Sequence, residues 1–225
     1  MLSKIRVLLV DDHAMVRQGL KSFLELTDEV EVVGEADNGM QALAQFEALQ
    51  PDVTLMDLVM PELDGIEATK HIRAKNTHAK ILILTSFIED EKVFPALEAG
   101  AQGYLLKDTS PDDLIQAILS IHQGESPLHP KVTKKLMSQL QKKPQAEEKQ
   151  VSPDAAISSL TQREQEVLEC LGRGYSNKDI ASALYISLKT VKTHVSNVLA
   201  KLDVADRTQA AIYAIKHGLV PLDEP

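Results

Sequence analysis

Short apolar runs alternate with segments of helical periodicity through the first half of the chain. The apolar runs are KIRVLLV at 4–10, EVVG at 31–34, VTLM at 53–56, KILILT at 80–85 and GYLL at 103–106. Their length and their β-branched residues predict buried strands. Between them apolar residues recur every three or four positions, which predicts helices at about 15–26, 41–49, 65–74, 91–99 and 111–122. Strands this apolar, joined by helices, predict an α/β fold with a five-stranded parallel sheet covered on both faces.

Several of these helices also carry boundary signals. Asn38 and Asp64 are suited to cap the second and third helices, and Ser110 precedes Pro-Asp-Asp at the start of the fifth. The fourth helix contains Pro95, which we expect to kink or shorten it, and Gly100 is placed to end it. The expected boundaries therefore rest on particular residues as well as on periodicity.

The second half of the chain has a different pattern. Residues 125–158 are rich in Lys, Gln, Pro, Ser and Glu, and they predict a linker in which 131–141 could form one amphipathic helix. The block that follows, 159–225, shows only helical periodicity. It predicts an all-α domain of four helices at about 161–171, 177–184, 188–202 and 207–217. We therefore expect two domains, at 1–124 and 159–225, separated by the linker.

The charge of the chain is distributed unevenly. The net charge of −9 combines 10 basic and 22 acidic residues in 1–125, 6 basic and 3 acidic in 126–158, and 8 of each in 159–225. An acidic first half and a neutral last block favour two domains with different partners. The single cysteine, Cys170, excludes a disulfide framework and indicates a reducing compartment. The first apolar run is too short to cross a bilayer, so we expect a cytoplasmic protein without a membrane partner.

Polar residues follow the predicted strands at the points where these strands end. Asp11 and Asp12 follow the first strand, Asp57 the third and Lys107 the fifth, and Thr85 closes the fourth. Ligands of open parallel sheets bind at the carboxyl ends of the strands, where the strand order reverses. If the spatial order of the strands is 2-1-3-4-5, these side chains share one crevice; periodicity alone does not establish that order.

The residue types at this edge suit phosphoryl chemistry. Carboxylates forced close together oppose one another's ionisation, and a hard divalent cation such as Mg²⁺ relieves that repulsion. Lys107 and Thr85 supply a positive charge and a hydroxyl for a phosphoryl oxygen, and Asp57 is a candidate nucleophile. The alternative for each residue alone is ordinary: Asp-Asp before a helix is often only a cap, and a lysine after a strand is usually solvated.

Four segments of the first half resemble the signature segments of response-regulator receiver domains. They are VLLVDDH, LMDLVMPELDG, ILILTS and GYLLKD. The resemblance implies that Asp57 accepts a phosphoryl group from a histidine kinase. It further implies Mg²⁺ binding by Asp11, Asp12, Asp57 and the Val59 carbonyl, contact of Thr85 and Lys107 with the phosphoryl group, and a switch role for the aromatic ring of Tyr104.

The residues two positions after Asp57 and Thr85 suggest how long the phosphoryl group persists. These residues are Val59 and Phe87, and neither can orient a hydrolytic water as a polar side chain could. We therefore expect slow self-dephosphorylation.

The helical block contains a pair of helices joined by a short turn. In NKDIASALYISLKTVKTHVSNVLAKL, which spans 177–202, the second helix has one apolar face. The other face and its flank present cations and small or hydrogen-bonding groups: Lys189, Lys192, Thr193, Ser196, Asn197 and Ala200. Such a face can enter a DNA major groove, although periodicity alone favours a solvated helix in a small bundle.

A second resemblance favours DNA binding. LTQREQEVLECLGRGYSNKDIASALYISLKTVKTHVSNVLAKLDVADRTQA is similar to the LuxR-type helix-turn-helix of NarL/FixJ response regulators. This implies a recognition helix at 187–202 and dimers on paired half-sites of promoter double-stranded DNA, with RNA polymerase as a further possible partner. The implied groove-facing residues are Lys189, Lys192, Thr193, Ser196 and Asn197. Within the family, SFIEDEKVFPALEAGAQGYLLKDTSP most resembles the LiaR/VraR type of cell-envelope-stress regulators of Gram-positive bacteria.

The sequence thus favours a two-component response regulator, a phosphoacceptor rather than an enzyme, with at most slow self-phosphorylation and self-dephosphorylation. One alternative is an Mg²⁺-dependent phosphohydrolase with Asp57 as its nucleophile, but Val59 stands where a second acid would serve as general acid or base. The other is an adaptor that works independently of phosphorylation. Turnover of phosphate esters would favour the first alternative, and failure to bind any DNA would favour the second.

Overall fold

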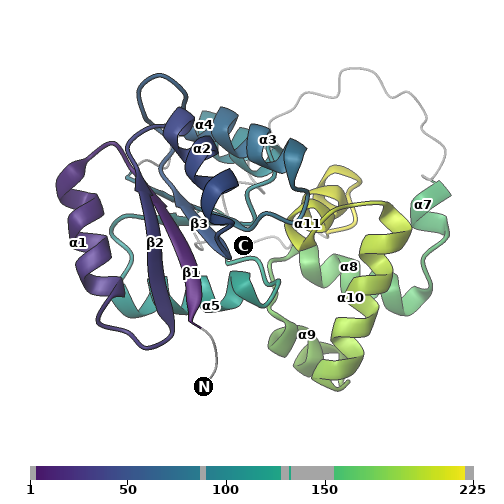
Figure 1. The fold of residues 1–225 in the computed structure, drawn as a ribbon. Coiled ribbons are helices and arrows are strands. Elements are labelled where there is room, and N and C mark those ends of the chain that lie inside the picture. The colour runs from purple at the N-terminus through teal and green to yellow at the C-terminus, as the bar shows by residue number, and fades with distance from the viewer. Residues whose placement is uncertain (1–3, 87–89, 128–131, 133–154, 221–225) are drawn as a thin grey trace. The chain divides into compact units, whose positions relative to one another are not determined.

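The structure, a computed structural model, describes residues 4–86, 90–127, 132 and 155–220. The chain forms two compact units, residues 1–129 and 130–225, and we describe each by itself (Figure 1). The helix expected at 131–141 and most of the expected linker lie outside the described residues.

The N-terminal unit is built on a five-stranded parallel sheet of order β2-β1-β3-β4-β5. This confirms both the predicted sheet and the order that had to be assumed. The strands are β1 Ile5–Val10, β2 Val30–Ala36, β3 Val53–Met56, β4 Ile81–Thr85 and β5 Gly103–Leu106. The second strand is longer than the predicted 31–34: it adds the buried residues Val30 and Ala36 and the polar residue Glu35, which interrupts the apolar run on this partly buried edge strand.

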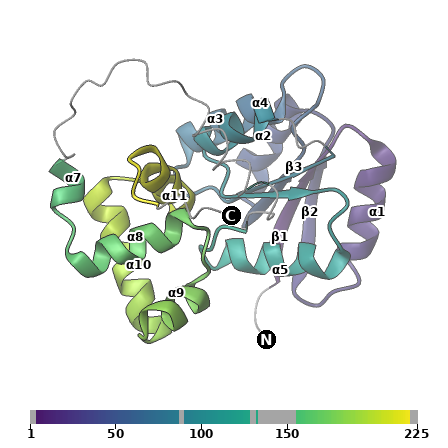
Figure 2. The same ribbon diagram turned by 180° about the vertical axis from the view of Figure 1, so that it is seen from behind.

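Helices cover both faces of this sheet, as predicted. They are α1 Ala14–Leu24, α2 Gly39–Leu49, α3 Gly65–Lys75, α4 Asp90–Glu98 and α5 Pro111–His122. Helices α1 and α5 share one apolar core with the strands, and α2, α3 and α4 group together away from α5 (Figures 1 and 2). Helix α1 ends before the predicted residue 26 because the Thr27 hydroxyl donates a hydrogen bond to the Leu24 carbonyl at the helix end.

The predicted helix boundary residues perform the expected roles. The side chains of Asn38, Asp64 and Ser110 each accept hydrogen bonds from backbone N–H groups in the first turn of the helix that follows. Pro95 lies inside α4, which ends at Glu98, and Gly100 has the left-handed φ of 105° that favours glycine after a helix.

The chain after α5 returns along the outer edge of β5. The backbone N–H of Tyr104 donates to the Pro127 carbonyl at 3.0 Å, so this edge strand is partly covered by its own chain. A Cβ at Gly103 would lie 2.7 Å from Leu82 Cδ1 and 2.9 Å from the Pro127 oxygen. Glycine at 103 therefore allows the returning segment to approach the strand closely.

The C-terminal unit contains the four predicted helices and a short one that we did not predict. They are α7 Ala155–Ser158, α8 Gln162–Gly172, α9 Asn177–Leu184, α10 Leu188–Leu202 and α11 Arg207–Lys216. Thr161 and Glu164 form a reciprocal capping box at the start of α8, and Lys201 Nζ lies 2.6 Å from Glu164 Oε2. This ion pair connects the start of α8 to the end of α10. Among the helices described here, none is long and apolar enough to span a membrane.

Candidate functional site

The strand order brings the predicted site residues to one edge of the sheet. Val10 pairs with Met56, so the residues that follow them, Asp11 and Asp57, are neighbours. The N–H of Asp57 donates to the Val10 carbonyl at 2.9 Å, and the N–H of Lys107 donates to the Thr85 carbonyl at 2.8 Å. Backbone hydrogen bonds therefore join the four strand ends in two pairs, β1 with β3 and β4 with β5, before any side chain is considered.

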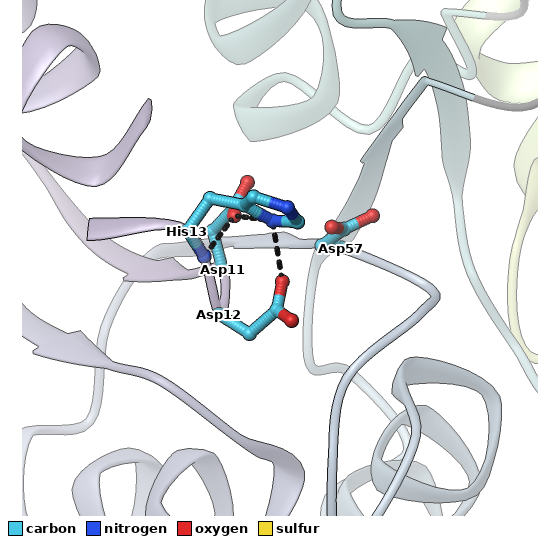
Figure 3. A group of neighbouring side chains, drawn as sticks. All are labelled: Asp11, Asp12, His13 and Asp57. Carbon is cyan, nitrogen blue, oxygen red and sulfur yellow. Dashed lines mark hydrogen bonds and ion pairs between the residues drawn. The ribbon is translucent and has the colours of Figure 1, made fainter. Parts of the chain in front are cut away.

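A cluster of acidic side chains lies at this edge. Ligand atoms of Asp11, Asp12, His13 and Asp57 all lie within 4.8 Å of one another (Figure 3). Asp11 is 3% exposed and Asp57 4% exposed, so neither carboxylate is well screened by water. The cluster requires a compensating cation, because buried like charges repel one another strongly.

In the described chain Lys107 supplies that compensation. Its Nζ lies 2.6 Å from Asp11 Oδ2 and 2.7 Å from Asp57 Oδ2. Burial lowers the pKa of the Lys107 ammonium, but the hydrogen bonds to Asp11 and Asp57 outweigh burial and raise that pKa above its ordinary value. The other oxygen of Asp57, Oδ1, accepts the N–H of Leu58 at 2.7 Å. Asp57 is thus held rigidly, with a positive charge beside one oxygen.

The donor set fits a hard divalent cation. It consists chiefly of carboxylate oxygens, the ligands that Mg²⁺ prefers. Within the part of the chain that the structure describes, Asp12 Oδ1 is buried and accepts no hydrogen bond, although His13 Nδ1 lies 2.7 Å away. An oxygen that lacks a hydrogen-bond donor in a carboxylate cluster is available to a metal ion.

Two further predicted residues are fully buried in the neighbouring strands. Thr85, at the end of β4, and Tyr104, in β5, are both 0% exposed. Val59, by contrast, is 40% exposed on the loop after β3. Phe87, the second residue of the dephosphorylation argument, lies outside the described residues.

Sequence reasoning missed His13. Its ring lies beside the carboxylates in Figure 3, with Nδ1 at 2.7 Å from Asp12 Oδ1 and 3.4 Å from Asp11 Oδ1. The backbone N–H of His13 also donates a hydrogen bond to Asp11 Oδ1 at 2.9 Å. The available signal was its position: a titratable residue directly follows two aspartates in the sequence.

Sequence reasoning also missed Gly65, the first residue of α3. Its N–H donates to the Leu58 carbonyl at 3.0 Å, which closes the loop after Asp57. A Cβ at this position would lie 1.9 Å from the backbone oxygen of Asp57. No larger residue fits without moving the segment that carries the carboxylate.

A second candidate site lies on α10. All five predicted groove-facing residues are exposed there, while Val191, Val198 and Leu202 on the opposite face are buried in the core of the unit. The N-cap Ser187 accepts the N–H of Thr190 at 3.1 Å, which starts the helix at the expected place. The exposed face carries two lysines between hydrogen-bonding side chains, as contact with DNA phosphates and base edges requires.

Two family models match the chain, one for each unit. Residues 7–119 match the response regulator receiver domain, and residues 158–214 match the bacterial regulatory proteins of the luxR family. Together these matches cover most of the chain.

Individual proteins are similar over almost the whole length. "Response regulator protein VraR" of Staphylococcus aureus is 47% identical over 216 residues, which cover 96% of this chain and 99% of VraR. The crystal structure of the response regulator ChrA of a heme-sensing two-component system is 37% identical, with a TM-score of 0.53, covering 97% of this chain and 100% of ChrA. A structure of two RcsB dimers bound to two parallel DNAs is 25% identical, with a TM-score of 0.55, covering 95% of this chain and 99% of that one.

Proposed function

Because the chain belongs to the two-component response regulators that combine a receiver domain with a LuxR-type DNA-binding domain, we propose that phosphorylation of Asp57 by a sensor histidine kinase controls its binding to promoter DNA. The phosphorylated protein would dimerise and occupy paired half-sites, next to which RNA polymerase would act. A DNA-bound regulator of this kind works in the cytoplasm.

The observation that carries the proposal is the environment of Asp57. Its carboxylate is almost fully buried, one oxygen accepts a backbone N–H, and the other contacts Lys107 at 2.7 Å. Catalysis of phosphoryl transfer depends mainly on such positioning and on neutralisation of charge. A carboxylate oxygen of Asp57 would form a bond to phosphorus as the phosphorus–nitrogen bond to the kinase histidine breaks, which yields an acyl phosphate and a free imidazole.

The neighbouring acids would bind the required metal ion. Asp11, Asp12, Asp57 and the backbone carbonyl of Val59 would bind Mg²⁺, which would neutralise charge on the transferred phosphoryl group. Lys107 would move from the two carboxylates to a phosphoryl oxygen, since its ammonium already lies beside both.

Thr85 and Tyr104 would transmit the change. The Thr85 hydroxyl would contact the phosphoryl group from the end of β4, and the Tyr104 ring, which is fully buried on β5, would move with it. A two-state rearrangement of this face would alter the surface available for dimerisation, and phosphorylation would shift the population between the two states.

DNA contact would come from α10. Lys189 and Lys192 would contact phosphates, and Thr193, Ser196 and Asn197 would contact base edges in the major groove. The likeness to the LiaR/VraR type, supported by the 47% identity with VraR, favours cell-envelope stress genes as targets.

The lifetime of the acyl phosphate would be long. Val59 is 40% exposed beside the site and has no polar group with which to orient a water molecule. Loss of the phosphoryl label should therefore be slow, and it should accelerate when Val59 is replaced by a polar residue.

The test of the proposal is the intact mass of the full chain after incubation with Mg²⁺ and a small phosphoryl donor, with light scattering on the same samples. Wild type and the control Asp28→Ala, an exposed loop acid, should each gain one phosphoryl group and dimerise. Asp57→Ala should gain none and remain monomeric. A phosphoryl adduct that persists in Asp57→Ala would refute the assignment of the acceptor. If the phosphorylated wild type keeps the molar mass of a monomer in light scattering, control by dimerisation is refuted.

A further inference from the structure

Two large apolar side chains stay exposed on the C-terminal unit, both at the start of the recognition helix. Within the described part of that unit, Tyr185 is 94% exposed and Leu188 45% exposed, whereas the other large apolar side chains are buried or half-buried. Single exposed apolar residues are ordinary. A pair separated by only two residues, directly beside the DNA-contact face, calls for a specific explanation.

The backbone of Tyr185 increases that need. It is the C-cap of α9 and adopts the left-handed conformation, with φ 54° and ψ 45°. A side chain with a Cβ is disfavoured there, and glycine or asparagine is the usual choice. The exposed ring recovers little of this cost through burial within the chain. Conformations of this kind persist where the surrounding structure enforces them, often at functional positions.

Leu188 occupies the first position of α10, and its neighbours indicate its partner. It lines the same surface hollow as Lys189, Lys192 and Thr193. The N-terminal residues of a recognition helix are those that approach base edges. Leu188, Lys189 and Lys192 are all exposed, so this stretch of the helix presents both apolar and cationic groups.

The chemistry of these neighbours favours DNA over a protein partner. Two lysines, Lys189 and Lys192, share the surface hollow with Leu188, and two apolar side chains are too small a surface for a stable protein interface, which buries about 1,200 Å² or more. The major groove offers one exposed apolar group, the C5-methyl of thymine. The sugars of the backbone offer a further apolar surface next to the phosphates.

We propose that Leu188 recognises a thymine by packing against its C5-methyl group, and that Tyr185 packs against a deoxyribose of the adjoining backbone. The inference rests on the proposed promoter binding and adds one base preference at the N-terminal end of α10. Leu188 would confer sequence specificity, and Tyr185 would strengthen binding to any sequence.

The experiment begins with the phosphorylated wild-type full chain, which selects sites from a random pool of double-stranded DNA. The Kd is then measured on the selected site and on copies in which each thymine in turn is replaced by deoxyuridine, which lacks only the methyl group. Burial of one methyl group predicts about a fourfold loss of affinity at one position. Leu188→Ala should lose about as much on the thymine site and lose nothing more on that deoxyuridine copy.

Two further variants complete the design. Leu26→Ala removes a leucine that is 84% exposed on the other unit, and it should bind all copies like wild type. Tyr185→Asn suits the left-handed turn, so the unit should fold, and its binding should weaken by the same factor on every copy. Circular dichroism verifies folding of each variant.

The outcomes separate this inference from the function on which it rests. Leu188→Ala that binds the selected site like wild type, or that loses affinity equally at every deoxyuridine copy, would overturn the thymine contact while promoter binding stands. Tyr185→Asn with wild-type affinity would overturn the deoxyribose contact. A wild type that selects no sequence at all would refute promoter binding itself.

Discussion

Replacing Gly65 by alanine should slow phosphorylation although the substitution removes no reactive side chain. The new Cβ would lie 1.9 Å from the backbone carbonyl oxygen of Asp57, 2.9 Å from the backbone carbonyl carbon of Asp57 and 3.0 Å from Leu58 Cα. All three are backbone atoms, so no flexible side chain can move aside. Because real Cβ contacts essentially never fall below 3.0 Å, the segment with Asp57 and α3 must separate by about 1.1 Å.

The displacement sets the expected size of the effect. A misplacement of about 1 Å in a reacting group costs roughly a hundredfold in rate. The clash should also destabilise the receiver by about 1–3 kcal/mol. Alanine is a better helix former than glycine by up to about 1 kcal/mol, which offsets only part of that cost. We therefore expect Gly65→Ala to fold, to unfold at a lower temperature and to phosphorylate far more slowly.

The assay is the rate at which the singly phosphorylated mass appears with Mg²⁺ and a small phosphoryl donor. It is run well below the unfolding transition that calorimetry gives for each variant. Gly19→Ala is the matched control, because a Cβ at this exposed position of α1 meets no atom within 4 Å. It should keep the wild-type rate. If Gly65→Ala phosphorylates within a factor of two of Gly19→Ala, the steric reasoning is wrong.

Three shorter predictions concern other contacts. Lys107→Ala leaves Asp11 and Asp57 facing each other without a cation, so added Mg²⁺ should raise its melting temperature more than that of wild type; an equal rise would contradict the charge argument. Gly103→Ala should destabilise the receiver by about 1–3 kcal/mol in urea unfolding, since its Cβ would meet backbone and side-chain atoms at under 3.0 Å. The Lys201 hydrogen bond, chiefly, lowers the pKa of Glu164 from 4.5 to about 2, so this contact stabilises the fold above pH 4.5 and is lost as the pH falls toward 2. Allowing for solvent screening at half-exposed Lys201, calorimetry should show a pH-dependent contribution of about 1 kcal/mol that is absent in Glu164→Gln.

Much of the fold was predictable because the local residue patterns favour the same strands and helices that the folded chain contains. Buried parallel strands need continuous apolar runs, and helix ends need caps, so the strands and residues such as Asp64 stood out in the sequence. The exceptions lie where the burial pattern weakens. The edge strand β2 carries polar residues such as Glu35 that hide its full length, and α7 is too short to show a period.

The strand order was not predictable from periodicity. It depends on contacts between residues distant in sequence, such as the pairing of Val10 with Met56. The order 2-1-3-4-5 therefore entered the sequence analysis as an assumption, and the structure confirms it. The same limit applies to Lys107, because its residue type suggested a phosphoryl contact but nothing in the sequence placed its ammonium between Asp11 and Asp57.

Unlike His13, whose side chain is itself titratable, Gly65 and Gly103 could not be recognised from the sequence for a shared physical reason. Asp57 and Lys107 were found because carboxylates and amines have chemistry that a strand end does not otherwise need. Gly65 and Gly103 act by having no side chain, and the space that excludes a Cβ exists only once Asp57 and Pro127 are in place. Reactive side chains can therefore often be predicted from the sequence. The glycines that allow the chain to pack closely around those side chains can be recognised only in the three-dimensional structure. The Gly65→Ala experiment measures how much of the site's reactivity depends on that second kind of residue.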